Sequence, residues 1–292
     1  MLIWLRAVRI RFLSSSLIAT LVGLAISWSR DNFIDPGLAI MTLVGVLSLH
    51  ASVDLLNDYT DYESGLDLLT KRTPFSGGSG VLPERLLSPK SVLYAGLAFL
   101  TIGAIIGIVL TIMRGWVIGL LLVFAVVSTI FYSSKLANIG LGEIVVVFKG
   151  AFIVLGTYYV QTLSLSQEPF LMGVVLGILS STVLFVNEFP DFKADTVKRR
   201  LNIVVRMGME KAGKLFFLFP LTSYLLLLIG IALGLFPILT GLTLALIPLY
   251  FLINRGLRSG LRKPEGFITT MSRSVIAGRL YGLIILAAYL VT

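Results

Sequence analysis

Long apolar runs recur along the whole chain, and they constrain its fold more than any other feature of the sequence. Each run is close to the roughly 20 residues that a helix needs to cross the hydrocarbon core of a bilayer. Backbone groups in lipid must find hydrogen bonds within the protein, so helices are the expected form. The sequence therefore predicts an all-α, polytopic membrane protein with a bundle of nine transmembrane helices, over residues 12–29, 36–56, 91–113, 116–134, 142–163, 169–187, 213–233, 237–253 and 272–291.

The remaining polar residues exclude several kinds of site. Charged residues make up 13% of the chain, about half the share of an average soluble domain, so an ordinary soluble enzyme is excluded. The chain has no cysteine and a single histidine, His50. Disulfides, thiolate chemistry, iron-sulfur clusters and His-rich metal sites are therefore excluded as well. We expect residues 1–292 to form one transmembrane domain.

Basic residues are concentrated on one side of the predicted bundle. The N-terminus and the loops after the second, fourth, sixth and eighth helices hold 21 of the 24 Lys and Arg residues. The positive-inside rule then predicts a multi-pass protein of the cell membrane, with the N-terminus and long loops in the cytoplasm and the C-terminus outside. The net charge of +9 is explained by this topology, so we expect membrane lipid and no nucleic acid as a partner. The sequence carries no signal for an oligomeric state.

Acidic residues gather in two windows on that same side. Eight of the 15 lie in residues 54–67, the first acidic window, or in residues 187–195, the second acidic window. At an offset of 130 residues the windows share the pattern Asn, acid, aromatic, any, Asp, aromatic, over residues 57–62 and 187–192. This likeness suggests an internal duplication. We therefore expect pseudo-repeated halves whose acidic ends meet across a cavity.

The first acidic window places its polar groups on one helix face. At about 100° per residue, five of them fall within about 100° of arc. They are His50, Asp54, Asn57, Asp58 and Asp61. Stacked carboxylates at a membrane boundary need cations, and oxygen ligands without His or Cys favour Mg²⁺ shared with phosphate oxygens. The two windows together predict a magnesium-bridged diphosphate site, although solvated, capped helix ends are the plainer alternative for one window taken alone.

The spacing of these acids resembles the two aspartate-rich motifs of the UbiA superfamily of intramembrane prenyltransferases. The motifs correspond here to Asn57-Asp58-x-x-Asp61 with Asp67, and to Asp191-x-x-x-Asp195. The resemblance begins at residues 4–9 and agrees with the nine-helix count. It implies that Mg²⁺ binds a polyprenyl diphosphate, that the diphosphate leaves, and that the allylic cation joins an acceptor held in the same cavity.

Four further stretches are similar to the branch of the superfamily that prenylates 1,4-dihydroxy-2-naphthoate in menaquinone synthesis. They are residues 57–65, 77–82, 140–143 and 155–162. Glu188-Phe189-Pro190 departs from that branch, which is more polar and often basic there. Geranylgeranylglyceryl phosphate, 4-hydroxybenzoate and haem are alternative acceptors for the same scaffold. A secondary transporter is the alternative of another class, but its sites would lie near the bilayer midplane rather than at the helix ends.

The resemblance implies a role for each acidic and basic group. Asn57, Asp58 and Asp61 would hold one of two Mg²⁺ ions, and Asp191 and Asp195 with Asn187 the other. Asp67 would be a further ligand or a group just behind the ligands. Arg72 and Lys198, with Lys71, would bind the diphosphate.

Five other polar residues complete the set that we consider. The superfamily often has a Tyr and a Lys where Tyr132 and Lys135 lie, which implies contact with the diphosphate; an interfacial anchor is the alternative. Lys149 falls inside a predicted span, so it serves either as a counter-ion in the cavity, which we favour, or as a snorkelling group. Asp54 could accept a proton from the acceptor or position Asn57. We expect His50 to be a hydrogen-bonded packing residue.

Overall fold

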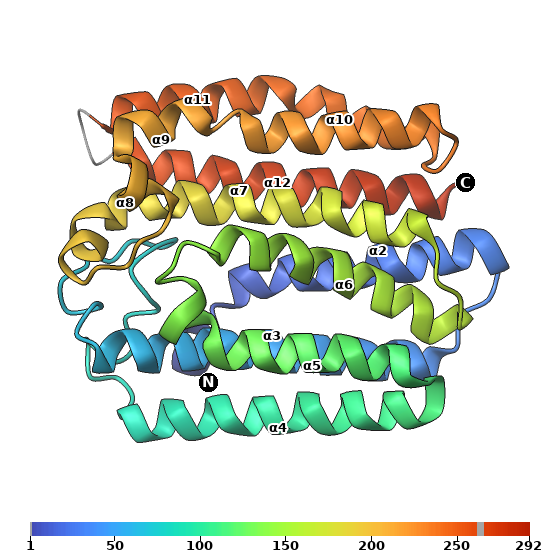
Figure 1. Cartoon of the computed structure of the whole chain (residues 1–292), viewed down its shortest axis with the longest axis horizontal. Coiled ribbons are helices and arrows are strands. Elements are labelled where there is room, and N and C mark those ends of the chain that lie inside the picture. The colour runs from blue at the N-terminus through green and yellow to red at the C-terminus, as the bar shows by residue number, and fades with distance from the viewer. Residues whose placement is uncertain (1, 262–265) are drawn as a thin grey trace.

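Long helices that run side by side build the molecule (Figure 1). The computed structural model describes residues 2–261 and 266–292. The longer helices are α2 (Ile10–Asp31), α3 (Pro36–Glu63), α4 (Pro89–Arg114), α5 (Trp116–Phe131), α6 (Gly142–Thr162), α7 (Gln167–Val197), α10 (Leu218–Ala232), α11 (Ile247–Gly260) and α12 (Gly266–Leu290). Shorter elements are α1 (Leu2–Ala7), the π-helical turn η1 (Tyr132–Leu136), α8 (Ile203–Met207), α9 (Met209–Leu215) and the 3₁₀ segment η2 (Ile238–Leu246).

The prediction of an all-α, multi-pass membrane protein is confirmed. Eight segments in the described part of the chain are long and apolar enough to cross a bilayer, and α5 adds a shorter apolar helix. The predicted bounds are wrong where the acidic windows begin. Helix α3 continues to Glu63 and α7 continues through Pro190 to Val197. Both windows are therefore largely helical, because their polar side chains find partners inside the protein.

The ends of the spanning helices follow from local sequence. Asp35 caps α3 by accepting a hydrogen bond from the Leu38 amide at 2.9 Å, and Pro36 follows it. Ser88 caps α4 in the same way, before Pro89. A side-chain oxygen at the cap and proline in the first turn satisfy or remove amide donors that have no partner in the helix. These caps fix where each helix enters the membrane region.

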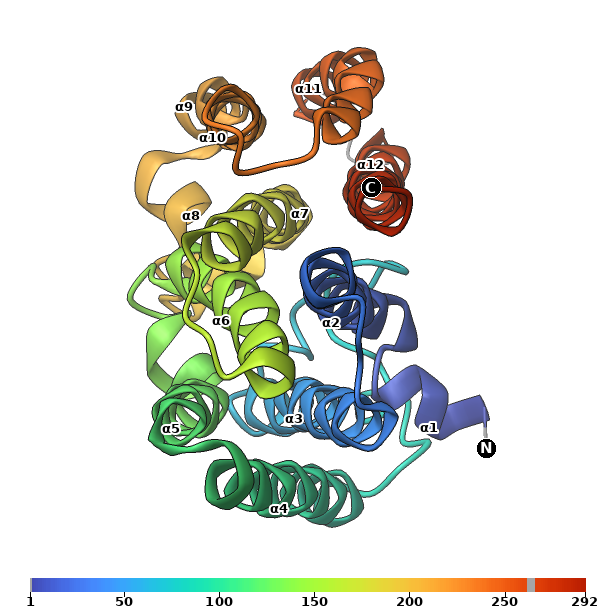
Figure 2. The ribbon, with the colours of Figure 1, turned by 90° about the vertical axis from the view of Figure 1, so that its right-hand side faces the viewer.

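Helix α2 occupies the centre of the arrangement when the bundle is viewed end-on (Figure 2). It contacts α3, α6, α7 and α12, whereas α4 packs outside α3, and α10 and α11 pack on the far side of α7 and α12. Helices α6 and α7 approach closely at Gly150, Gly173 and Gly177, where an added Cβ would lie within 3.0 Å of backbone atoms of the other helix. Small residues allow such close helix contact inside membranes.

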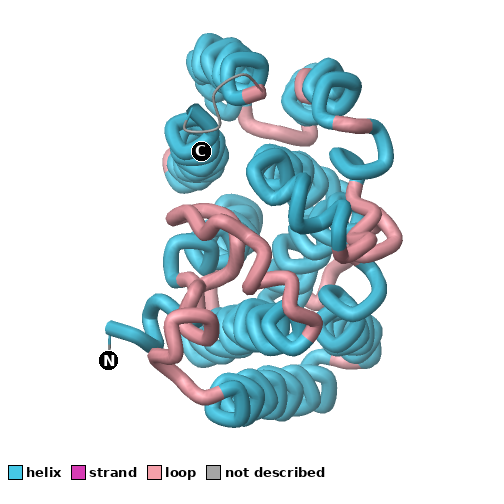
Figure 3. The backbone as a smooth tube through the Cα atoms, turned by 90° about the vertical axis from the view of Figure 1, so that its left-hand side faces the viewer, coloured by secondary structure: helices cyan, strands magenta, loops and turns pink. Residues whose placement is uncertain are grey.

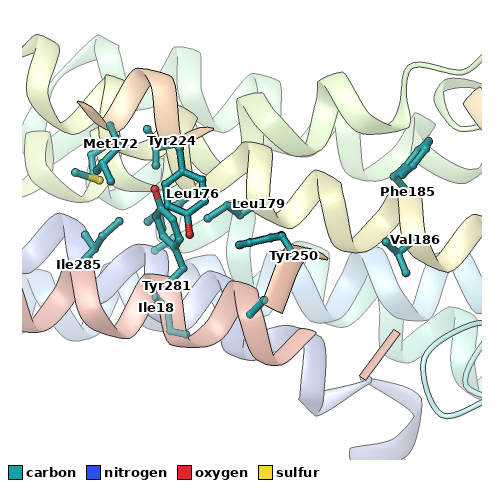
Figure 4. Packing of buried hydrophobic residues seen from close by; sticks show 14 of the residues in the cluster. Ile18, Met172, Leu176, Leu179, Phe185, Val186, Tyr224, Tyr250, Tyr281 and Ile285 are labelled. Atoms are coloured by element: carbon teal, nitrogen blue, oxygen red, sulfur yellow. The ribbon is translucent and has the colours of Figure 1, made fainter. Parts of the chain in front are cut away.

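Buried aromatic and aliphatic side chains hold α7, α10, α11 and α12 together. Tyr224, Tyr250 and Tyr281 pack against one another among Met172, Leu176 and Ile18 (Figure 4). At one end of this core, Glu168 is 3% exposed and accepts hydrogen bonds from Arg30 Nε at 2.8 Å and Tyr289 Oη at 2.9 Å. This cluster ties α2, α7 and α12 together.

The long connections gather at the other end of the bundle (Figure 3). They comprise residues 64–88, η1 with residues 137–141, and residues 198–208 with α8. The C-terminus lies at the opposite end (Figure 1). This is the separation of loops and C-terminus that the distribution of charge predicted; Arg262 and Lys263, which belong to that distribution, lie outside the described residues.

Candidate active site

A cavity of about 310 Å³, lined by charged, polar and apolar side chains, opens among the helices at the loop end. Side chains from both acidic windows line it, together with groups from the N-terminal turn and from the loops. The polar residues of the lining that matter below are Arg9, His50, Asp54, Asn57, Asp61, Asp67, Tyr132, Lys149, Asn187, Glu188, Asp191, Asp195, Arg200 and Asn202. The two windows thus face each other across one cavity, as their matching patterns predicted.

A second cavity, of about 150 Å³, continues from the first between α3, α4, α5 and α6. The two share His50, Val53, Ser128, Lys149 and Ile153. Most of the other residues of the second cavity are aliphatic or aromatic, and on α3 they extend back to Thr42. At 1.5 Å per residue, the eleven steps from Val53 back to Thr42 span about 16 Å. A chamber that contains the charged side chains therefore leads into an apolar one within the bundle.

Arginines neutralise the first acidic window. Asp58 is 1% exposed and forms an ion pair with Arg9, which lies between α1 and α2. Asp61 accepts a hydrogen bond from Arg200 Nη1 at 2.9 Å and another from Asn57 Nδ2 at 2.9 Å. Burial alone would lower the pKa of the Arg200 guanidinium, but the Asp61 and Asp195 carboxylates outweigh that effect and raise it. Arg200 follows the second window, so it joins the two windows electrostatically.

A glycine-rich loop also connects the windows, through backbone amides. The amide of Ser79 donates to both carboxylate oxygens of Asp58, at 3.2 and 3.3 Å, and the amide of Gly77 donates to Asp191 Oδ2 at 3.2 Å. Gly77, Gly78 and Gly80 all have φ between 71° and 78°, a backbone conformation that favours glycine. A Cβ on Gly78 would lie 2.7 Å from Asp67 Oδ2. The loop thus closes tightly over the acids.

The second acidic window keeps more of its acceptor capacity. Asp195 accepts a hydrogen bond from Asn202 Nδ2 at 2.7 Å. Asp191 Oδ1 and Asn187 Oδ1 are buried without a hydrogen-bond partner in the described part of the chain, and so is Asp54 Oδ2. Outside the spanning helices, burial raises the pKa of Asp67 to about 7, helped by Asp61 and Asp58. The unpartnered oxygens of Asp191, Asn187 and Asp54 are therefore the ones available to a cation or ligand.

The structure brings together nine of the predicted site residues around the cavity. They are Asp54, Asn57, Asp61, Asp67, Tyr132, Lys149, Asn187, Asp191 and Asp195. Asp58 lies just behind the cavity wall, where Arg9 and the Ser79 amide bind it. The predicted set of acids is therefore assembled in one place.

Four predicted basic residues lie outside the cavity lining. Lys71 and Lys198 are exposed, and the ammonium group of Lys198 reaches toward Gly65 at the end of α3. Arg72 pairs with Glu84 at 3.2 Å. Lys135 is exposed and lies over the Phe131 ring, 5.2 Å from its centroid. As exposed cations, these four are well solvated without a ligand.

Several groups in and around the cavity were missed by the sequence reasoning as site residues. Arg9 and Arg200 were counted only among the basic residues, and Asn202 carried no signal. Glu143 and Glu188 lie at neighbouring ends of α6 and α7, are buried, and interact with each other. The basic run at residues 198–200 was the available signal for Arg200, but choosing its buried member required the turn that follows α7.

The residues of the cavity are better suited to bind a divalent cation together with a ligand than to coordinate it with protein groups alone. Among the described residues, no three Asp, Glu or His side chains converge closely enough to hold a metal ion. The unpartnered oxygens of Asn187 and Asp191 on α7, and of Asp54 on α3, are hard donors on two walls of the cavity. Mg²⁺ is commonly held in this manner, by one or two carboxylates on each side and by phosphate oxygens between them. The donor chemistry therefore suits Mg²⁺ bound together with a diphosphate.

Such a cavity, with charged side chains at the loop end and an apolar continuation within the bundle, is typical of an intramembrane enzyme. The pattern of the UbiA prenyltransferase family matches residues 16–274, so the chain belongs to this family and is a prenyltransferase.

Two similar proteins are 1,4-dihydroxy-2-naphthoate octaprenyltransferases. The one from Escherichia coli (strain K12) is 28% identical over 72% of this chain and 70% of its own length. The one from Mycobacterium leprae (strain TN) is 31% identical over 61% of this chain and 60% of its own length. A UbiA homologue from Archaeoglobus fulgidus, solved with DMAPP and Mg²⁺, superposes with a TM-score of 0.62 at 14% identity over 97% of this chain and 99% of that one. This last likeness supports the fold.

Proposed function

We propose that this chain transfers a polyprenyl group from its diphosphate to an aromatic acceptor inside the membrane, with 1,4-dihydroxy-2-naphthoate as the acceptor. The observation that carries the proposal is the junction of the two cavities. Acids and arginines surround the chamber at the loop end, and apolar side chains surround the chamber that continues from it. A diphosphate and its isoprenoid tail need these two environments side by side. The naphthoate prenyltransferases named above support the choice of acceptor.

The acids bind the diphosphate through Mg²⁺, and the arginines bind it directly. We propose that two Mg²⁺ ions, held by Asn57, Asp58, Asp61 and Asp67 on one side and by Asn187, Asp191 and Asp195 on the other, supply positive charge to the leaving diphosphate. Arg9 and Arg200 then add charge-assisted hydrogen bonds from the cavity wall. When the carbon–oxygen bond of the prenyl diphosphate breaks, both electrons leave with the diphosphate. This arrangement favours the charge distribution of the transition state.

The deeper part of the cavity handles the acceptor. As the new carbon–carbon bond forms, the acceptor loses a proton, and Asp54 is a carboxylate with an unpartnered oxygen at the cavity wall. Tyr132 lies at the cavity beside Glu188 and Arg200, where it shields the cation from water. Exclusion of water matters because water would capture the allylic cation.

A transfer assay tests the proposal directly. Purified protein in liposomes is given radiolabelled prenyl diphosphates of several lengths and a panel of acceptors, with Mg²⁺ or with a chelator. We expect a prenylated naphthoate product that needs Mg²⁺. Product formed only from 4-hydroxybenzoate, geranylgeranylglyceryl phosphate or haem would replace the acceptor and keep the reaction class. No product from any acceptor would overturn the proposal.

We also propose that the loop end of the bundle faces the cytoplasm of the cell that makes the protein. The excess of basic residues at this end supports that orientation. Because the chain has no cysteine, single cysteines introduced at Thr196 and Ser164 can be labelled without background. These positions are exposed and lie at opposite ends of the bundle. In intact cells an impermeant maleimide should label S164C and spare T196C; the reverse pattern would invert the topology.

A further inference from the structure

Three titratable side chains line the cavity further from the loop end than Asp58, Asp61 and the second acidic window. His50 and Asp54 lie on α3, eight and four residues before Asp58, which places them about 12 and 6 Å further from the loop end. Lys149 approaches them from α6 and interacts electrostatically with both. The three residues form a separate polar group below the proposed diphosphate site.

His50 is held in place by a hydrogen bond, and Asp54 keeps an oxygen that can still accept one. His50 Nδ1 hydrogen-bonds Ser16 Oγ at 2.7 Å, and its Nε2 lies 3.9 Å from Asp54 Oδ2. Asp54 is 8% exposed, and its Oδ2 has no hydrogen-bond partner in the described part of the chain. His50 is thus the hydrogen-bonded packing residue that the sequence suggested.

Lys149 differs from Arg9 and Arg200, the two cavity cations beside the acidic windows, because no carboxylate pairs with it. Arg9 and Arg200 each pair with a buried aspartate. Among the described residues, Lys149 has neither a hydrogen bond nor an ion pair within 4.0 Å, and Asp54 acts on it only at longer range. An ammonium group inside a membrane bundle is expensive unless an anion or water meets it. Its charge is therefore available to a molecule that enters the cavity.

The surroundings of Lys149 indicate the shape of that molecule. Lys149 borders both cavities, and beyond it the second cavity is lined by Phe124, Phe152 and Ile153. The two phenylalanine rings meet edge-to-face, with centroids 4.8 Å apart. A flat aromatic ring at this junction would lie against an apolar wall and still reach a cation at its edge. The subsite therefore suits an aromatic acid.

We propose that Lys149 binds the carboxylate of the aromatic acceptor and thereby makes the chain selective for acceptors that carry an anionic group beside the ring. The proposal rests on the proposed function, in which the acceptor enters below the diphosphate. It specifies the anion for which Lys149, predicted from the sequence to be a counter-ion in the cavity, provides the charge. Asp54 faces the same subsite and is positioned for the proton that the acceptor loses.

Acceptor binding in the absence of prenyl diphosphate tests this role without any turnover. Purified protein in detergent is titrated anaerobically with 1,4-dihydroxy-2-naphthoate and with 1,4-dihydroxynaphthalene, which lacks the carboxylate, and ligand fluorescence reports binding. We expect wild type to bind the carboxylate at least about tenfold more tightly, the factor expected for one charge-assisted hydrogen bond. Lys149→Met should abolish this preference, and Lys149→Arg should retain most of it. Lys90→Met, at an exposed lysine of α4, is the matched control.

Each outcome bears on one claim. Equal binding of both ligands by wild type overturns the Lys149 proposal, and this arm needs no variant. If Lys149→Met does not fold, Lys149→Gln takes its place, and a preference that survives in the folded variant overturns the proposal. The proposal is also overturned if a Lys149 variant no longer binds DMAPP with Mg²⁺ but binds the acceptor as wild type does. The proposed function fails separately, when wild type transfers prenyl groups to neither naphthalene acceptor.

Discussion

The two acidic windows share a sequence pattern but differ in how the protein treats their charge. In the first window, Asp58 and Asp61 are already paired with Arg9 and Arg200. In the second, Asp191 interacts with the Gly77 amide and the Ser76 side chain, and its Oδ1 has no hydrogen-bond partner within the described residues. The repeated motif thus has one side whose carboxylates are paired with arginines and one side whose oxygens have fewer partners within the protein. We therefore expect substitutions in the first window to lower both stability and activity, and substitutions in the second to lower activity alone.

The largest effect is expected at Asp191, on activity. Asp191→Asn keeps the shape of the side chain and removes the charge that a cation would meet. We expect prenyl transfer to fall by about a hundredfold or more, with the melting temperature in detergent unchanged or higher, because an uncompensated buried charge is removed. Transfer rates across a Mg²⁺ titration and a thermal-shift assay measure the two quantities. Asp31→Asn, at the other end of the bundle, is the control. Normal activity of the Asp191→Asn variant at limiting Mg²⁺ would contradict the assignment of Asp191 as a cation ligand.

Asp61 should behave in the opposite way with respect to stability. Asp61→Asn leaves Arg200, whose side chain is 17% exposed, without its partner, and stranding one member of a buried pair costs roughly 3 kcal/mol. The melting temperature should therefore drop, along with activity. In the double variant Asp61→Asn with Arg200→Met, the loss should be smaller than the sum of the single losses. Additive losses would show that the pair does not act as a unit.

The sequence was sufficient for the parts of this site that depend on local pattern. Helical periodicity placed Asn57 and Asp61 on one face, and hydropathy located the helices that bring Asp191 and Asp195 to the same end of the bundle. Long apolar runs predict helices reliably, because backbone groups in lipid must find their hydrogen bonds within the protein and a helix supplies them within one segment. The internal duplication remains a prediction from the pattern.

Choosing among the basic residues required the structure. Lys198, Arg199 and Arg200 are consecutive, yet the chain turns after α7 with Arg199 at φ 55°, and only Arg200 points into the cavity. Arg9 reaches Asp58 from a segment 49 residues away. Neither fact follows from helical periodicity, because both depend on how irregular segments fold back. This is also why Glu143 and Glu188 escaped notice as neighbours.

The loop that joins the windows provides a sharper and smaller test. Gly78→Ala should cost about 1 to 3 kcal/mol, because φ is 71° there and the new methyl group meets the Asp67 carboxylate. Gly208→Ala is a matched control, since φ is 77° at that position and no heavy atom lies within 4 Å of the added carbon. The difference between the two melting temperatures isolates the contact with Asp67. If contact with Asp67 matters to the cation site, only Gly78→Ala should raise the Mg²⁺ concentration needed for half-maximal transfer.

The smallest effects are expected at the exposed cations that sequence alone favoured. Lys198 is solvated and reaches toward Gly65 rather than the cavity, and Arg72 pairs with Glu84, which is 44% exposed. Exposed pairs contribute about 0 to 1 kcal/mol, so Lys198→Gln and Arg72→Gln should each change the KM for prenyl diphosphate less than about threefold. Arg200→Lys keeps the charge but loses the planar donor that reaches Asp61, and should raise that KM more than either. A larger effect at Lys198 than at Arg200 would mean that the diphosphate lies outside the cavity, over the end of α3, and that the pairing of the first window with Arg200 serves the fold alone.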